Sequence, residues 1–283
     1  MCLFSRSHSN NVWDERLQIA TNNMWHSYLI NLSDNRVRLE RSRKQFDALG
    51  IGFSRVDAVN GWMLSEAESA RVYDRRAGKR RFKYELVKPE IGCYLSHIEC
   101  WRQIAESREG GGFIFEDDFH AAPELKSVLE AVSRDDGDWD VVKLFTLKER
   151  SKQISQRPLT KDHWIVMPYR VPTCLIGYGI RRQAADRLVG ESIPFFRPVD
   201  EDMKFFWEKS IKVALVVPPP VSVGDQQTQT GTIGMARKTA QARSGRGQLA
   251  KAAKNIAFQL HYNGLLLYHR TVGALVPGRR PWR

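Results

Sequence analysis

Gly112-Phe113-Ile114-Phe115-Glu116-Asp117-Asp118 joins a short apolar run directly to three consecutive acidic residues. A continuous apolar run beside glycines predicts a buried strand, because such a strand has no solvated face. Successive strand residues point to opposite faces, so we expect Glu116 and Asp118 to project one way and Asp117 the other. In open α/β sheets, ligands bind just beyond the carboxyl ends of the strands, which is the position predicted for these acids.

The acidic triplet allows two interpretations. Hard oxygen ligands at a strand end suit a magnesium- or manganese-type ion that keeps its other positions for water and phosphate. Acidic triplets are also common in solvated loops that bind nothing. Both interpretations are open on this stretch alone, so the surrounding chain has to separate them.

The chain before this strand predicts a βαβ unit. Residues 27–32 have the apolar character of a strand, and Ser33 is a candidate N-cap for a helix that Gly50 ends. A second strand near residues 53–59 runs into Asn60-Gly61, which is a turn signal. A strand, a helix and a strand within about 35 residues predict parallel pairing.

The same alternation continues to the C-terminal part of the chain. A helix is predicted from Pro89 to Ala105, because proline and Glu90 both suit a first turn. Further predicted elements are helices at 123–132, at 182–188 and after Asp200, and strands at 140–145, 174–180 and 213–217. We expect an α/β fold with a mostly parallel sheet flanked by helices. Its parts are an extension at 1–23, one domain at 24–233 and a basic helical tail at 234–283.

Composition places the chain among globular proteins. It has 283 residues, of which 42% are hydrophobic and 27% charged, enough for a substantial core. No uninterrupted apolar stretch approaches the ~20 residues needed to cross a bilayer, and the first residues lack the apolar core of a secretory signal. We therefore expect a cytoplasmic protein.

The four cysteines are expected to be buried free thiols. Cys93 and Cys100 lie seven positions apart in a predicted helix, which separates them by about 10 Å along its axis. A disulfide cannot close that gap without distortion. The spacings of Cys2, Cys93, Cys100 and Cys174 also give no zinc pattern.

The formal net charge of +12 is concentrated near the C-terminus. No acidic residue follows Asp225, whereas ten of the 44 basic residues do, so the rest of the chain is close to neutral. This distribution favours attachment to an anionic surface and argues against nucleic-acid binding by the domain.

The basic tail also contains a predicted amphipathic helix. Leu249, Ala253, Ile256 and Leu260 share one face of it, and basic and aromatic residues are interleaved around them. A peripheral membrane contact through residues 237–283 would combine apolar insertion with attraction to anionic lipid. The alternative is a helix that caps the domain and ends in solvated basic residues.

Several separated segments together carry a resemblance to one family. They are Ile30-Asn31-Leu32 with Arg38, Ala58-Val59-Asn60-Gly61, residues 90–97, residues 114–118, residues 139–144, residues 177–180 with Ala184-Ala185, and Pro198-Val199-Asp200. In order and spacing these segments resemble glycosyltransferase family 25, and the acidic triplet is similar to the DxD-type motif of nucleotide-sugar glycosyltransferases. The resemblance covers roughly residues 27–224. Ser33 and Asn60 depart from it, since aspartate is usual at both positions.

The resemblance implies a GT-A fold, a nucleotide-sugar donor such as UDP-galactose, a divalent cation (Mn²⁺ or Mg²⁺) and inversion at the anomeric carbon. A cation at this position would neutralise the diphosphate charge as the sugar leaves. We expect Asp118 to be the best direct metal ligand. Glu116 is expected to be a second ligand, and Asp117 is expected to support the bound nucleotide.

Other residues receive donor-site roles from the same resemblance. Asn31 and Arg38 are expected to seat the nucleotide, with structural pairing as the alternative for Arg38. Asn60-Gly61 and Ser96-His97 are also assigned to donor binding, although a helical histidine among apolar neighbours is more often a hydrogen-bonded core residue. Lys143, on a predicted buried strand, is a candidate partner either for phosphate or for an acidic neighbour.

An inverting displacement needs a carboxylate to take the proton of the acceptor hydroxyl. Asp200 and Asp202 follow a proline-punctuated loop and precede a predicted helix. If that helix begins at Asp202, its N-terminal amides would orient an acidic side chain, and at least one of the two is expected to be an N-cap. We assign Asp200 as the base, with Asp202 as the alternative.

These observations predict an inverting, metal-dependent glycosyltransferase. We expect it to transfer a sugar, with galactose from UDP-galactose first, onto a lipooligosaccharide, a lipopolysaccharide or another surface glycan at the inner face of the cytoplasmic membrane. One alternative is a protein acceptor or another nucleotide sugar. A second is a catalytically silent sugar- or lipid-binding protein on the same fold.

Overall fold

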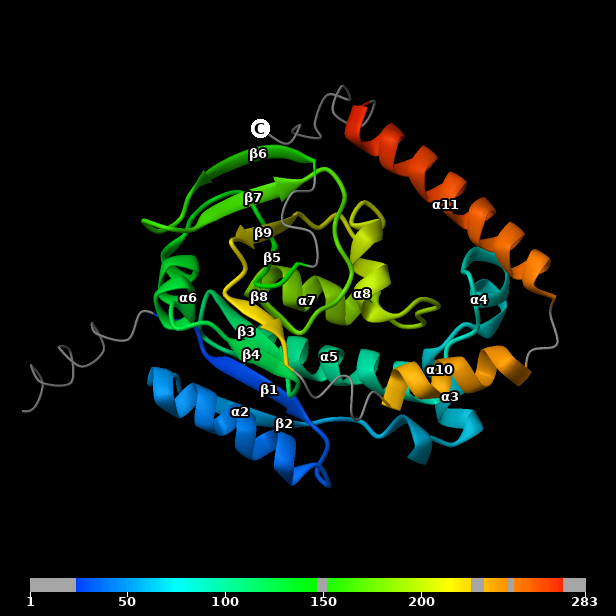
Figure 1. The fold of residues 1–283 in the computed structure, drawn as a ribbon, viewed down its shortest axis with the longest axis horizontal. Helices are drawn as coiled ribbons and strands as arrows, with labels where there is room; N and C mark the ends of the chain where they lie inside the picture. The colour runs from blue at the N-terminus through cyan, green and yellow to red at the C-terminus, as the bar shows by residue number, and fades with distance from the viewer. Residues whose placement is uncertain (1–23, 147–151, 225–231, 244–246, 272–283) are drawn as a thin grey trace, which may run out of the picture.

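The computed structural model describes residues 24–146, 152–224, 232–243 and 247–271. It has a central sheet with helices packed on both faces (Figure 1). The α/β fold expected from the sequence is confirmed. The extension at 1–23 and the basic residues after Thr271 lie outside the described residues.

The elements of the described residues follow the predicted alternation. The strands are β1 (Ser27–Asn31), β2 (Phe53–Asp57), β3 (Gly111–Glu116), β4 (Phe119–Ala121), β5 (Val141–Lys143), β6 (Gln153–Pro158), β7 (Trp164–Pro168), β8 (Gly177–Arg181), β9 (Val213–Val217) and β10 (Val221–Val223). The α-helices are α2 (Arg36–Leu49), α3 (Glu66–Val72), α4 (Arg75–Arg81), α5 (Lys88–Glu106), α6 (Leu125–Arg134), α7 (Arg182–Glu191), α8 (Val199–Asp202), α10 (Thr232–Arg243) and α11 (Gln248–Thr271). Two 3-10 turns, η1 (Gly61–Met63) and η2 (Met203–Phe205), complete the set.

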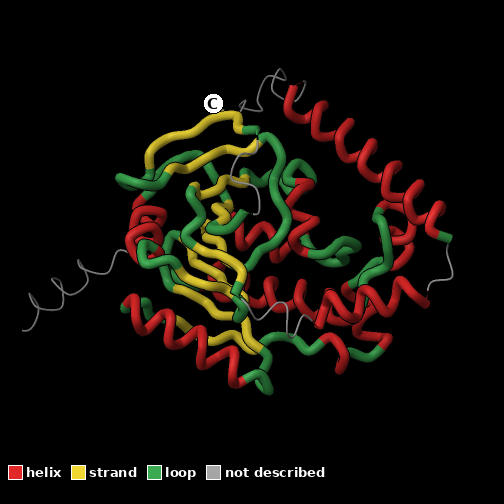
Figure 2. The backbone as a smooth tube through the Cα atoms, viewed as in Figure 1, coloured by secondary structure: helices red, strands yellow, loops and turns green. Residues whose placement is uncertain are grey.

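The main sheet has eight strands in the order β2-β1-β3-β8-β5-β9-β7-β6. β1 pairs in parallel with β2, as the predicted βαβ unit requires. It also pairs in parallel with β3. Strand direction is mixed elsewhere, since β8 runs antiparallel to both β3 and β5. The β6–β7 hairpin forms one edge of the sheet (Figure 2) and is not among the strands expected from the sequence.

The core lies on both faces of the sheet, and β3 divides its side chains between them. Ile114 packs in the cluster that contains buried residues of α5 and α7. Phe113 and Phe115 pack in the cluster that contains Phe46 of α2 and the buried face of α6. Because side chains alternate along a strand, the residues after Phe115 also diverge to opposite faces.

The start of α2 differs from its prediction. The N-cap of α2 is Asn35, whose side chain accepts a hydrogen bond from Arg38 N, and not Ser33. After β1 ends, the chain first closes a turn in which Asn35 N donates to Leu32 O, so the helix begins later. Its end is as predicted, because Gly50 has a φ of 61°, in the left-handed region that glycine adopts without strain.

The C-terminal segment contributes to the same core. Phe258, Tyr262 and Leu266 of α11 are buried in the cluster that also contains Phe82 and Phe205. Their spacing of four residues places them on one face of the helix. Among the described helices, none combines the length and apolar character needed to span a membrane.

Candidate active site

The acidic triplet divides at the carboxyl end of β3. Glu116 is directed to α5, where its Oε1 lies 3.3 Å from His97 Nε2. Asp117 is directed to α2, where its Oδ1 accepts a hydrogen bond from Arg38 Nη1 at 2.9 Å. Glu116 and Asp117 therefore face opposite sides of the sheet, as strand alternation predicts.

Asp118 lies in the turn after β3 and is buried. Its charge acts on Cys93 of α5, whose thiol pKa is raised well above its usual value by burial and then by nearby carboxylates that include Glu116 and Asp118. Glu116 and Asp118 are thus both within electrostatic reach of one side chain on the α5 side.

Asp117 is held by buried polar contacts. Besides Arg38, Asn31 donates from Nδ2 to Asp117 Oδ2 at 2.6 Å, and Asn31 Oδ1 accepts from Arg55 Nε at 3.1 Å. Burial raises the pKa of Asp117, and the contacts with Asn31 and Arg38 oppose that rise. The structure therefore places Asn31 and Arg38, both predicted to seat the nucleotide, around the middle acid.

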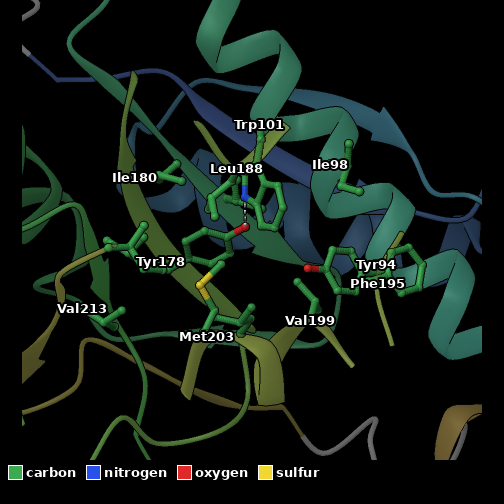
Figure 3. Packing of buried hydrophobic residues seen from close by; sticks show 14 of the residues in the cluster. Tyr94, Ile98, Trp101, Tyr178, Ile180, Leu188, Phe195, Val199, Met203 and Val213 are labelled. Carbon is green, nitrogen blue, oxygen red and sulfur yellow. Dashed lines mark hydrogen bonds between the residues drawn. The ribbon is translucent and has the colours of Figure 1, made fainter. Parts of the chain in front are cut away.

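A buried hydrogen-bond network positions Glu116 on the α5 side of the sheet, opposite the side on which Asp117 is held. Trp101 Nε1, which can only donate, lies 2.8 Å from Tyr178 OH, as Figure 3 shows. Tyr178 OH lies 2.9 Å from His97 Nδ1. If the phenol, which accepts from Trp101, donates its own proton to His97 Nδ1, the Nε2–H of that tautomer donates to Glu116. No sequence pattern identifies this network, because the residues come from α5, β3 and β8.

The donor groups near Glu116 favour a hard divalent cation. One ligand atom each from Cys93, His97 and Glu116 lies within 4.8 Å of the others. Cys93 would be a soft sulfur ligand, and both His97 nitrogens face other polar groups. The predicted oxygen ligands are the carboxylates of Glu116, which belongs to this group, and of Asp118, which does not, and oxygen ligands fit Mg²⁺ or Mn²⁺.

The two candidate bases have different surroundings. Asp202 is buried and accepts hydrogen bonds from Arg197 Nε at 2.8 Å and from Tyr94 OH at 2.6 Å. Arg197 is itself buried and also pairs with Glu208. Asp202 is thus part of an internal ion pair, which makes it poorly placed to take a substrate proton.

Asp200 is partly exposed and accepts hydrogen bonds from backbone N–H groups. Its Oδ2 accepts from Cys174 N at 3.0 Å and its Oδ1 accepts from Glu201 N at 2.8 Å. Neither aspartate caps α8, which starts at Val199 after Pro198, whereas Asp202 occupies the N-cap position of the 3-10 turn η2 without making a side-chain capping hydrogen bond. Proline has no N–H to satisfy and its fixed φ suits a helix start, so the turn begins before both acids.

Asp200 shares its surroundings with Glu116. After burial, the largest cause, the charges of both acids raise the pKa of the Cys93 and Cys174 thiols, the latter to about 12. Burial lowers the pKa of Lys143 to about 8, and the same two charges act against that change. Asp200 therefore lies within electrostatic reach of the groups around the end of β3.

Lys143 supports the loop that holds Asp200. It is fully buried on β5, and its Nζ donates to the backbone oxygens of Pro172 and Thr173, the latter at 2.8 Å. The next residue, Cys174, has a φ of 72° and donates its N–H to Asp200. Both of these contacts are with backbone carbonyls, so the lysine fixes a loop beside the acids.

The remaining residues that were predicted to bind the nucleotide-sugar donor make close contacts with the backbone. Ser96 Oγ accepts from Val59 N at 2.9 Å and donates to Gly92 O at 2.8 Å. A Cβ on Gly61 would lie 1.8 Å from Lys88 O, so only glycine fits where η1 meets α5. Asn60 caps η1 through a bond from Trp62 N.

A residue of the C-terminal segment also reaches this region. Arg237 of α10 donates from Nε to Glu90 Oε1 at 3.0 Å, and its guanidinium lies over the Tyr84 ring. Burial raises the pKa of Glu90, Arg237 opposes that rise, and Asp200 adds to it. The sequence assigns Arg237 only to the basic tail, because contact with α5 depends on the path of the chain.

Comparison with known proteins gives a family match. The model described as "Glycosyltransferase family 25 (LPS biosynthesis protein)" matches residues 24–203. Procollagen galactosyltransferase 1-A of Xenopus laevis is 27% identical over 190 residues, which are 64% of this chain and 31% of that protein. A putative glycosyltransferase of Haemophilus influenzae is 32% identical over 114 residues, 40% of this chain and 39% of that protein.

A third relative limits what the match implies. Inactive glycosyltransferase 25 family member 3 of Homo sapiens is 26% identical over 200 residues, 64% of this chain and 31% of that protein. The chain spans about a third of the length of the first curated relatives that it matches. Resemblance at this level includes an inactive protein, so family membership does not by itself specify catalysis.

Proposed function

Because the chain belongs to glycosyltransferase family 25, we propose that it transfers a sugar from a nucleotide diphosphate to a hydroxyl group of a glycan acceptor. One observation carries this proposal. Of the four aspartates predicted at the site, Asp117 and Asp202 are each hydrogen-bonded to an arginine. Asp200 is partly exposed, and its charge acts on Cys93 together with the charges of Glu116 and Asp118. The arrangement leaves carboxylates for two distinct tasks.

The first task is to hold a divalent cation. Glu116 and Asp118 would be its protein ligands, and His97 would orient Glu116 through the Trp101–Tyr178 network. When bound, Mn²⁺ or Mg²⁺ supplies a Lewis acid that offsets the charge on the departing diphosphate. The remaining coordination positions suit phosphate oxygens and water.

The second task is proton removal, which we assign to Asp200. Its carboxylate takes the proton of the acceptor hydroxyl while the hydroxyl oxygen forms a bond to the anomeric carbon. The bond from that carbon to the diphosphate oxygen breaks on the opposite side, so the configuration inverts and the nucleoside diphosphate leaves. Cys174 N–H and the loop fixed by Lys143 keep the carboxylate in place.

The donor and acceptor are part of the proposal. The procollagen galactosyltransferase relatives support galactose as the first sugar to test, and we propose UDP-galactose as its donor. The family description names LPS biosynthesis and so supports a lipopolysaccharide acceptor, and we propose that this or a lipooligosaccharide acceptor is met at the inner face of the cytoplasmic membrane. The procollagen relatives support a protein acceptor as the alternative.

A panel of nucleotide sugars tests the proposal. Purified full-length protein is incubated with each donor and Mn²⁺, and release of the nucleotide is measured with and without acceptor. We expect release from one preferred donor, its loss in Asp200→Asn, and its retention in Asp186→Asn, which changes an exposed aspartate of α7. Donor binding without release from any member of the panel, with or without acceptors, would favour the catalytically silent alternative.

A further inference from the structure

Helix α11 is apolar on two opposite faces. Its inner face places Phe258, Tyr262 and Leu266 in the core. The residues on the far side are 249, 253, 256, 260 and 267, which fall within about a quarter of the helix circumference at 3.6 residues per turn. A helix that only capped the domain would be expected to carry polar residues on this second face.

The far side is exposed to solvent. The exposed fractions are 87% for Leu249, 59% for Ile256, 69% for Leu260 and 55% for Leu267, and Ala253 is exposed as well. We call these five residues the outer stripe. Single exposed leucines are ordinary, but four large aliphatic side chains aligned along one helix, with a gap at Asn263 and Gly264, form an apolar stripe that indicates a binding partner.

A lysine-lined hollow lies at the N-terminal part of the same helix. It has a volume of about 330 Å³ and lies between α4 and α11, with Lys79, Lys83, Lys251 and Lys254 around it. Lys254 Nζ donates to Lys79 O at 2.8 Å, which joins the two helices beside the hollow. Four of the residues that line this hollow are lysines, so it concentrates positive charge beside α11.

The charge around this hollow is predominantly positive. Lys79 pairs with Glu85 at 3.3 Å and Lys83 pairs with Glu201 at 2.8 Å. The segment after Asp225, which includes α10 and α11, contains no carboxylate side chain. Helix α4 adds Arg76 and Arg80, both exposed, beside the N-terminal part of α11 (Figure 1).

The stripe and the hollow are close enough to act on one surface. A helix with its side chains is about 10 Å across, and the Debye length at physiological salt is about 8 Å. Lys251 and Lys254 lie on the side of α11 opposite the outer stripe, so a flat surface touched by the stripe would lie about one helix diameter, slightly more than one screening length, from them. A protein partner would need a complementary apolar groove, whereas a bilayer offers apolar depth and negative charge along the whole helix.

We propose that α11 is a peripheral membrane anchor: the outer stripe enters the interface of an anionic bilayer, and the basic residues around the hollow, on the opposite side of the helix, attract that bilayer through their charge. This inference deepens the proposed function by naming the surface that presents the acceptor, and it rests on that function only for the identity of the acceptor. Binding to lipid is measured without any sugar transfer, so the two proposals fail separately.

Flotation with lipid vesicles tests the anchor. Full-length protein is mixed with vesicles of phosphatidylcholine alone or of phosphatidylcholine with phosphatidylglycerol. We expect binding to the anionic vesicles that weakens as salt is raised, and at most weak binding to the neutral ones. The double variant Ile256→Ser/Leu260→Ser should bind about tenfold more weakly or worse, because two inserted aliphatic groups are lost.

Two further variants make the test specific. Lys251→Glu/Lys254→Glu should weaken binding to anionic vesicles by about tenfold or more, because each lysine near the surface contributes electrostatic attraction. Val37→Ser, which changes an exposed aliphatic residue of α2, is the matched control and should bind like the wild type. Nucleotide release without vesicles should stay unchanged in all of these variants.

Three results would overturn the proposal. The first is equal binding to neutral and anionic vesicles, and the second is unchanged binding in the Ile256→Ser/Leu260→Ser variant. The third is a dimer in light scattering that this double variant dissociates, because the outer stripe would then be an interface between two copies of the chain.

Discussion

The guanidinium of Arg38 donates to Asp117 Oδ1 at 2.9 Å, although the two residues are 79 positions apart in the chain. This hydrogen bond joins α2 to the end of β3. It engages Asp117, the middle acid of the triplet, in a contact within the protein. The side chain of Asp117 is 12% exposed and that of Arg38 is 16% exposed, so the pair is largely shielded from water. The acids on either side of Asp117 are the ones left for a ligand.

Removing Arg38 should therefore reduce stability. Arg38→Met leaves a buried carboxylate with Asn31 as its remaining described donor, which should cost about 3 kcal/mol of unfolding free energy. Urea unfolding measures the loss, with the exposed Arg36→Met as the control. If Arg38 instead contacts the donor phosphates, the variant will keep wild-type stability and lose nucleotide affinity.

Substitution of Asp200 should affect turnover, whereas substitution of Asp202 should affect stability. Asp200→Asn should lower turnover by about 10²–10⁴ while donor binding and the unfolding midpoint stay near wild type. Asp202→Asn should instead lower the unfolding free energy, because Arg197 and Tyr94 lose a charged partner in a buried site. Turnover and denaturation are measured on both variants, and the opposite assignment of effects would show that Asp202 is the base.

Metal affinity should depend on the acids that flank Asp117. Titration of Mn²⁺ by electron paramagnetic resonance measures binding without reference to turnover. Glu116→Ala and Asp118→Ala should each weaken binding about tenfold or more, because each removes a direct ligand. Asp34→Ala, which changes an exposed aspartate in the turn after β1, should bind Mn²⁺ normally. Unchanged affinity in both site variants would place the cation elsewhere.

Stability should rise with pH through the titration of Lys143. Burial lowers its pKa from 10.5 to about 8, so between these values the unfolded chain holds a proton that the folded protein has released. From about pH 7.5 to about pH 9.5, this group should add about 2 kcal/mol to the unfolding free energy. The gain should be absent in Lys143→Met and present in the exposed Lys161→Met. Identical pH curves for wild type and Lys143→Met would show that the buried amine does not titrate in this range.

The inner face of α11 should be part of the cooperative fold. Tyr262→Ala removes a fully buried aromatic side chain and should cost about 3–5 kcal/mol, as large-to-small core changes do. Leu260→Ala, at a position 69% exposed, should change stability by no more than about 0.5 kcal/mol. Chemical denaturation compares the two, and equal small effects would mean that α11 unfolds independently of the domain.

Local pattern predicts most of the fold around the site. The apolar run before Glu116 indicates a buried strand, and Gly50 indicates the end of α2, because both signals depend on neighbouring residues alone. The hairpin of β6 and β7 is different. Its first strand, Gln153–Pro158, is mostly exposed, so it has no apolar periodicity to reveal it.

The candidate site is only partly predictable for a related reason. Asp200 and Asp202 are two positions apart and chemically identical, and no sequence rule says that Arg197 and Tyr94 meet only one of them. Likewise, His97 looks like an ordinary core histidine until Tyr178 and Glu116 are placed on either side of it. These differences come from contacts between distant parts of the chain.

The sequence by itself determined which chemistry is present: acids at the end of β3, two aspartates after a proline loop, and a cationic C-terminal segment with an apolar stripe. The tertiary structure decided which of those groups face one another. Backbone pattern is set by local sterics and hydrophobic period, whereas burial and pairing depend on residues that only folding brings together. For that reason the aspartate at 202 is neutralised by an arginine while the one at 200 stays accessible.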